Sequence, residues 1–147
     1  MVNYMGDWHL IAFCHLRNNW RIFLIGRMTE CQKKTRTFET RPQNQWQPDL
    51  LDTFGIFQGR EKFDVKLRFT PTRSTVVKNE MWHENQRAYV DDQGFYNLTI
   101  PASHETEIMM EILKHGSQVE VLEPDWLRKK VAIEIRESLK NYEENRK

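Results

Sequence analysis

Two arginines and a phenylalanine in the first third of the chain are the residues best suited to chemistry. Arg21 and Arg27 are an even number of positions apart with Phe23 between them, so an extended backbone would place all three on one face. A guanidinium group binds phosphate through paired hydrogen bonds, and an aromatic ring stacks on nucleobases. The pattern therefore predicts a site for a phosphate-bearing ligand. The alternative is that the arginines are ordinary exposed strand residues and that Phe23 belongs to the core.

The distribution of charge favours the same region. The chain of 147 residues has a formal net charge of only +1. Residues 1–48 nevertheless contain seven Lys/Arg against three Asp/Glu, whereas residues 49–147 contain fifteen against eighteen. An anionic ligand should therefore prefer the first third of the chain.

Other chemistries have little support in the sequence. The His-Glu pairs at residues 83–84 and 104–105 are not part of an HExxH motif, and Cys14 and Cys31 lack the spacing of a zinc site. No GxSxG turn or glycine-rich phosphate loop is present. We therefore expect a protein that is not an enzyme and uses no metal or cofactor. No apolar run approaches the roughly 20 residues of a membrane span, which predicts a cytoplasmic protein without a membrane partner.

The elements that must position the arginines read as a β-hairpin. Residues 8–15 are apolar at nearly every position, as in a strand covered on both faces, and residues 20–25 are again aromatic and β-branched. Asn18-Asn19 between them suits a tight turn, because asparagine tolerates positive φ. A short helix is predicted over residues 49–54, and a domain boundary near Gly59.

The remainder of the chain alternates strands and helices. The expected elements are strands at 63–69, 89–90, 96–100 and 119–122, and helices over 71–81, between Ser103 and Gly116, and from about Asp125. Their order is strand, helix, strand, strand, helix, strand, followed by a terminal helix. This order is typical of the ferredoxin-like split βαβ arrangement. In the last helix, Leu127, Val131, Ile135 and Leu139 are four residues apart, which predicts one continuous apolar face.

Several segments resemble the WYL-domain family of bacterial transcriptional regulators. The run GDWHLIAFCHLRNNWRIFLIGRM, residues 6–28, is similar to the signature in which a Trp-Tyr-Leu strand leads through a turn to an Arg/Phe-rich strand. Residues 46–59 resemble the segment that closes the WYL domain. KFDVKLRF, DDQGFYNLTI and residues 115–131 resemble parts of the family's C-terminal extension. The resemblance thus covers nearly the whole chain.

The resemblance implies an α+β fold in two domains. Residues 1–58 would form a partial Sm-like (SH3-like) β-barrel, and residues 59–147 a ferredoxin-like βαββαβ domain with a C-terminal helix. The helix-turn-helix that usually precedes a WYL domain is absent from this sequence, so DNA binding would need an upstream region or a partner. A complete barrel has further strands before the tryptophan, so we expect an open sheet edge and a homodimer.

The resemblance also implies the ligand and its site. Matching positions in the family form a basic pocket for nucleic-acid-like effectors, which predicts binding of single-stranded DNA or a nucleotide. The residues carried over are His9, Arg17, Arg21, Phe23 and Arg27. Three positions depart from the signature: His9 replaces its Tyr, Leu24 an Arg and Gly26 an Asp. A second interpretation therefore stays open, a structural dimerisation fragment that binds no ligand.

Overall fold

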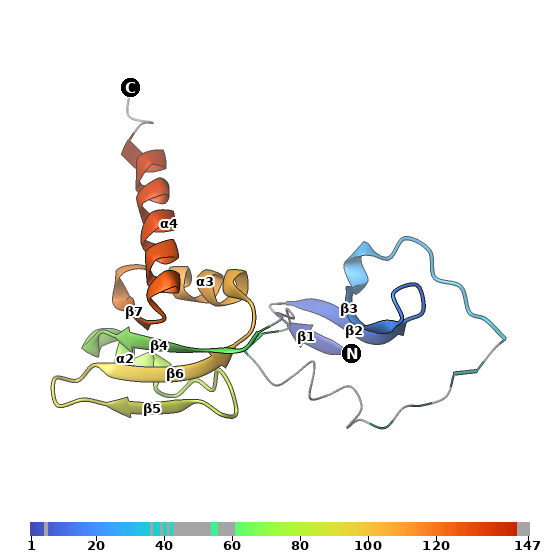
Figure 1. Ribbon diagram of the computed structural model, residues 1–147, viewed down its shortest axis with the longest axis horizontal. Helices are drawn as coiled ribbons and strands as arrows, with labels where there is room; N and C mark the ends of the chain where they lie inside the picture. Colours follow the sequence, from blue (N-terminus) through green and yellow to red (C-terminus); the bar gives the residue numbers. More distant parts are fainter. Residues whose placement is uncertain are drawn as a thin grey trace. The chain divides into compact units, whose positions relative to one another are not determined.

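The structure is a computed structural model that describes residues 1–4, 6–35, 37, 38, 40, 42, 54, 55 and 61–143 (Figure 1). The chain divides into two units, residues 1–50 and 51–147, and each has its own antiparallel sheet. All described α-helices lie in the second unit, so the protein is a mixed α/β chain. The predicted domain boundary between residues 58 and 59 lies outside the described residues.

The first unit contains the predicted hairpin. Its strands are β1 (Val2–Tyr4), β2 (Asp7–Cys14) and β3 (Asn19–Leu24), which pair in the order β1-β2-β3, and a 3-10 turn η1 (Ile25–Arg27) follows. Asn18, in the turn between β2 and β3, has a φ of 48°. The predicted role of asparagine in this turn is therefore confirmed, because a side chain with short polar atoms tolerates this conformation.

The expectation that residues 8–15 are covered on both faces is wrong for the described structure. No residue of β2 is buried, and Trp8 is 53% exposed. A strand is buried on both faces only when a further layer packs on each side of its sheet. The described elements of the first unit form a single sheet followed by η1, so both apolar faces remain partly exposed.

The second unit has the expected order of elements. They are β4 (Phe63–Phe69), α2 (Pro71–Val77), β5 (Arg87–Val90), β6 (Tyr96–Ala102), α3 (Glu105–Lys114), a 3-10 turn η3 (Gly116–Gln118), β7 (Val119–Glu123) and α4 (Asp125–Glu143). The sheet order is β5-β6-β4-β7, and every neighbouring pair is antiparallel. Strands that follow one another through a helix are therefore separated in the sheet by one other strand.

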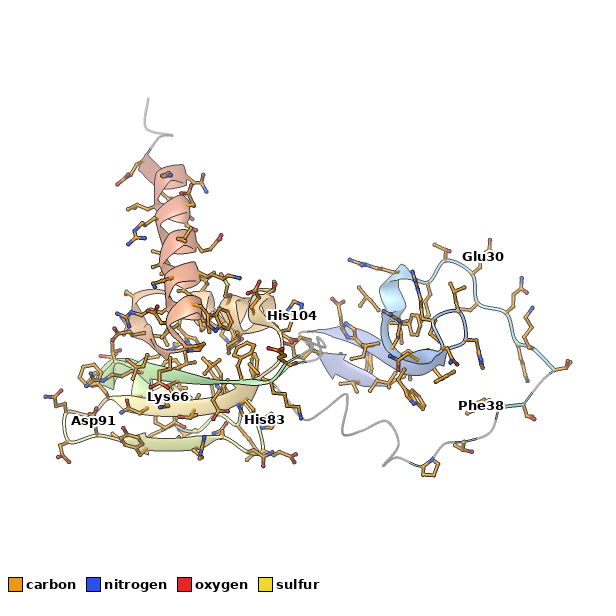
Figure 2. All side chains as sticks on the ribbon, viewed as in Figure 1. Glu30, Phe38, Lys66, His83, Asp91 and His104 are labelled. Carbon is orange, nitrogen blue, oxygen red and sulfur yellow. The ribbon has the colours of Figure 1, made fainter. Side chains whose placement is uncertain are left out.

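The core of the second unit lies on one face of this sheet. Side chains alternate along β4, so Val65, Leu67 and Phe69 are fully buried, as the period-2 pattern predicted. Lys66 is on the opposite, exposed face and forms an ion pair of 2.9 Å with Glu123 of β7 (Figure 2). The buried apolar residues of α2, β6, α3, β7 and α4 complete the core: Val77, Tyr96, Leu98, Ile100, Ala102, Ile108, Ile112, Val121, Leu127 and Val131.

Two predicted helix boundaries are wrong by a few residues. α2 begins as predicted, since the side chain of Thr70 accepts a hydrogen bond from the Arg73 N–H, but it ends at Val77 instead of residue 81. Val76 is half-exposed, so packing does not offset the low helix propensity of this β-branched run. α3 begins after His104 instead of Ser103, and the His104 side chain makes no capping hydrogen bond.

Phe54, which precedes the strands of the second sheet, makes a backbone contact with the end of β6. The helix predicted over residues 49–54 lies outside the described residues except for Phe54. Phe54 forms an isolated parallel bridge with Ala102, and its N–H donates a hydrogen bond of 2.9 Å to β6. Gly55 follows with a φ of 87°, and an added Cβ would lie 1.9 Å from the Glu107 carboxylate. Only glycine fits there, because both the conformation and the space exclude a side chain.

The terminal helix α4 is amphipathic as predicted, but only half of its apolar face is covered. Leu127 and Val131 are buried, whereas Ile135 and Leu139 are 49% and 54% exposed. The C-terminal half of α4 extends beyond the other elements of its unit (Figure 1). At 19 residues α4 is the longest described helix, and no described helix is long and apolar enough to cross a membrane.

We expect two leucines of the same helix face to differ in their effect on stability. Leu127→Ala should lower the free energy of unfolding by about 2–5 kcal/mol, because it leaves a cavity in the core. Leu139→Ala should change it by no more than about 0.5 kcal/mol, because its side chain is half in water. Urea unfolding followed by circular dichroism measures both. Equal losses would show that the end of α4 is packed.

Candidate functional site

The register of the first hairpin decides which predicted ligand residues share a face. Arg21 lies opposite Ala12, and Phe23 lies opposite Leu10. Residues directly opposite in an antiparallel pair point to the same face, and neighbours along a strand point to opposite faces. Arg21, Phe23, Leu10 and Ala12 therefore share one face of the first sheet.

Trp8 belongs to the same surface. It has the same strand parity as Leu10 and Ala12, and it is half-exposed. Trp8 is not among the ligand residues that the sequence predicts, and it is the hairpin register, combined with the alternation from Trp8 to Ala12, that places it on this face. We call this surface the Arg21 face: Trp8, Leu10, Ala12, Arg21 and Phe23.

His9 lies on the opposite face of the sheet. It pairs with Leu24 of β3 and with Val2 of β1. Its Nδ1 lies 3.2 Å from the carbonyl oxygen of Asp7, and its ring meets the edge of Tyr4 at 6.4 Å between centroids. The structure therefore does not bring His9 together with Arg21 and Phe23.

Arg17 and Arg27 lie just outside the two ends of β3. β3 ends at Leu24, and Arg27 lies in the 3-10 turn η1, so strand parity does not extend from Arg21 to Arg27. The expectation that parity places these two arginines on one face is wrong for this reason. Arg17 lies in the β2–β3 turn, where its N–H donates to the Cys14 carbonyl at 3.2 Å. Both side chains are exposed.

The Arg21 face combines a cation with aromatic and apolar groups. Ala12, directly across from Arg21, is too short to cover the guanidinium, and Arg21 is exposed. Phe23 lies two residues along the same strand, and Trp8 is near it on the same face. None of the strand residues on this face is acidic. Such a surface can hold a phosphate beside a stacked base.

A second polar cluster lies in the second unit around His115, whose side chain is fully buried. The Nε of Arg73 donates a hydrogen bond of 2.9 Å to His115 Nδ1. Trp82 stacks on the imidazole with centroids 5.6 Å apart, and Phe69 meets it edge-on at 5.2 Å. The cluster joins α2, the segment after it and the end of α3. The sequence predicts only that His115 lies near the end of the helix between Ser103 and Gly116.

Burial lowers the pKa of His115, and the charges of Arg73 and Lys114 lower it further, although Glu111 and Glu80 oppose them. The imidazole is therefore neutral near pH 7. Because Nδ1 accepts the hydrogen bond from Arg73, the proton of the neutral ring belongs on Nε2. The hydrogen bond links α2 to the C-terminal end of α3. The buried imidazole of His115 is not accessible to a ligand as a general base.

The exposed face of the second sheet has a shallow hollow of about 380 Å³. Its lining residues are Lys62, Asp64, Asn85, Arg87, Thr99 and Pro101. An ion pair of 2.9 Å between Arg87 and Asp64 joins two strands of its wall, so opposite charges meet there. Within the described ranges, no three His, Cys or acidic side chains come together as metal ligands.

Comparison with known proteins links both units to described families. A family model described as the WCX domain matches residues 61–139, more than half of the chain. A model described as the WYL domain matches residues 1–33. Among solved structures, the chain is similar to proteasome accessory factor B/C (PafBC) of Arthrobacter aurescens, with 20% identity and a TM-score of 0.47. That alignment covers 94% of this chain and 21% of PafBC, so the chain spans about a fifth of PafBC's length. No curated protein sequence matches the chain.

We expect the His115 cluster to make stability depend on pH. The unfolded chain takes up a proton on this imidazole near its ordinary pKa of 6.5, before the folded chain does, because folding lowers the pKa. Stability should therefore be full above pH 6.5 and fall as the pH drops toward the folded pKa. His115→Gln keeps an acceptor for Arg73 but does not titrate, so its free energy of unfolding should fall less between pH 7 and pH 5.

Chemical denaturation at several pH values measures this difference. The variant and the parent chain should be of similar stability at pH 8, where the His115 imidazole of the parent chain is unprotonated in both the folded and the unfolded state, and this comparison controls for lost packing. If the free energies of unfolding of the parent chain and of His115→Gln fell equally between pH 8 and pH 5, His115 would not be a source of the pH dependence.

Proposed function

The chain belongs to the WCX-domain family and carries a WYL-domain segment ahead of it, and on this premise we propose that it is the ligand-sensing and oligomerising module of a WYL-type transcriptional regulator. Its effector is an anionic, nucleic-acid-like molecule, either single-stranded DNA or a nucleotide. The module binds and does not catalyse. The observation that carries this proposal is the Arg21 face, where an exposed arginine shares one face of the sheet with two aromatic residues, Phe23 and Trp8.

The chemistry of the Arg21 face favours an unpaired nucleotide strand over a duplex. Stacking on Trp8 or Phe23 requires the face of a base, which a duplex keeps inside its own stack. Arg21 supplies paired donors for a phosphate, and exposed Arg17 and Arg27 at the two ends of β3 add attraction at longer range. The excess of basic residues in the first third of the chain acts in the same direction.

The departures from the WYL signature fall mostly away from the Arg21 face. Leu24, which replaces an arginine, lies opposite His9 on the other side of the sheet. Gly26 lies in η1, where nothing approaches within 4 Å of an added Cβ. These positions support a retained ligand surface, and they weaken the alternative of a dimerisation fragment without a ligand.

We assign the second unit to the ferredoxin-like fold and the first to a partial Sm-like barrel. The order β5-β6-β4-β7, with antiparallel neighbours and helices in both crossovers, supports the first assignment. The meander of β1, β2 and β3 supports the second, because its outer strands leave two edges where further strands can pair.

Regulation in this scheme depends on a difference in affinity. A ligand on the Arg21 face changes how subunits associate only if it binds one arrangement more tightly than another. A helix-turn-helix region, upstream or in a partner, would convert that change into altered affinity for DNA.

We expect Arg21→Ala and Trp8→Ala each to weaken binding of labelled single-stranded DNA by about tenfold, because each removes a charge or a stacking surface. Fluorescence anisotropy at two salt concentrations measures this, and Arg21→Ala should also reduce the salt dependence. His9→Ala is the matched control on the opposite face and should bind like the parent chain. Equal losses in all three variants, or equal affinity for duplex DNA, would contradict a site on this face.

A further inference from the structure

β5 forms an open edge of the second sheet. It is the outermost strand in the order β5-β6-β4-β7, and all four of its residues are exposed. The opposite edge is different, because Arg128 of α4 donates a hydrogen bond of 2.7 Å to the Val121 carbonyl of β7. No other strand of the described chain pairs with the outer side of β5. An edge of this kind is a template for another strand.

The register of β5 identifies its unpaired backbone groups. The Asp91 N–H donates a hydrogen bond of 2.9 Å to the Phe95 carbonyl. In an antiparallel ladder, hydrogen-bonded positions alternate with positions whose N–H and C=O groups point away. Since Tyr89 and Arg87 are two and four residues before Asp91, they also face β6. The outward groups therefore belong to Ala88 and Val90.

We propose that β5 pairs in antiparallel fashion with β5 of a second copy of this chain, around a two-fold axis at Tyr89. Only the backbone N–H and C=O groups that point away from β6 can form hydrogen bonds with a second β5 strand. Ala88 and Val90 can therefore pair only with the same two residues of the second copy. Opposing Ala88 to Val90 of the second copy is the register that engages both residues of both copies. It extends two four-stranded sheets into one continuous sheet.

The side chains of β5 complement themselves in this register. Arg87 lies opposite Asp91 of the second copy, so each end of the contact joins a cation to an anion. Each residue already has a partner within its own chain, Asp64 for Arg87 and Arg68 for Asp91, so the new pairs extend two existing ones. Tyr89, which is 66% exposed, meets its own equivalent on the axis. This charge pattern favours a second copy over an unrelated strand.

The length of β5 limits the strength of this contact. Pairing of four residues buries much less than the roughly 1,200 Å² of a standard stable interface. We therefore expect a weak dimer that dissociates on dilution. The contact lies in the second unit and uses no residue of the Arg21 face, so it stands or falls independently of the proposed ligand.

Cysteine cross-linking of the whole chain tests the register directly, in a Cys14→Ala/Cys31→Ser background. In the proposed pairing, the two Tyr89 Cα atoms lie about 4.5 Å apart, within disulfide range. The two Ala88 Cα atoms are offset by two residues and lie roughly 8 Å apart, beyond that range. Tyr89→Cys should therefore form a disulfide-linked dimer on mild oxidation, and Ala88→Cys is the matched control that should not. Equal cross-linking of the two variants, or none in either, would overturn the pairing.

Sedimentation equilibrium at high micromolar concentration tests the backbone contribution. Ala88→Pro removes an outward N–H without touching the β5–β6 ladder, and should weaken self-association by at least about tenfold. Ala88→Val keeps the N–H and should associate like the parent chain. A parent chain that stays monomeric, or a folded Ala88→Pro variant with unchanged association, would overturn the proposal. If circular dichroism shows that Ala88→Pro is unfolded, the two cysteine variants decide.

Discussion

The alternation of side chains between the two faces of a paired strand is the constraint on which the rest of this structure depends. In β4 and β6, Leu67 lies opposite Leu98, and both are buried, while Lys66 on the other face reaches an acidic partner in water. Burying one such leucine contributes about 1.5–3 kcal/mol, whereas an exposed ion pair contributes about 0–1 kcal/mol. The apolar face therefore determines stability, and the charged face mainly disfavours a shifted register.

The same constraint has a different result in the first unit. There both faces of β2 carry apolar side chains, and none of its residues is buried in the described structure. The pairing register of β2 and β3 places Arg21 and Phe23 on one face of the sheet and His9 on the other. The Arg21 face therefore carries a cation and aromatic side chains together. The second unit has a core of its own, whereas no residue of β2 in the first unit is buried, and this difference suits the proposed division between scaffold and ligand surface. Function in this proposal belongs to the surface and not to the fold.

Polar groups inside the second unit support its packing. His115 has no contact with water, yet Arg73 supplies its Nδ1 with a donor and Trp82 and Phe69 enclose its ring. A buried polar group that lacks a partner costs free energy, so this hydrogen bond selects one arrangement of α2 against the end of α3. Trp82 lies in the loop between α2 and β5, so its stacking on His115 anchors this loop to a residue that is distant in the sequence.

The sequence by itself determined the order of elements, because the information is local. The alternation in residues 63–69, the asparagines of the first turn and the cap at Thr70 each act within a few residues, and the WYL-like signature identified the family. The tertiary structure decided which residues meet. A change of one residue in hairpin register would exchange the two faces, so the sequence could not separate His9 from Arg21 or add Trp8. Strand parity also could not show that β3 ends before Arg27. Apolar residues recur every four positions along the whole of α4, yet Leu127 is buried and Leu139 is not. Burial depends on which neighbouring elements cover each residue, and the local sequence does not specify those neighbours.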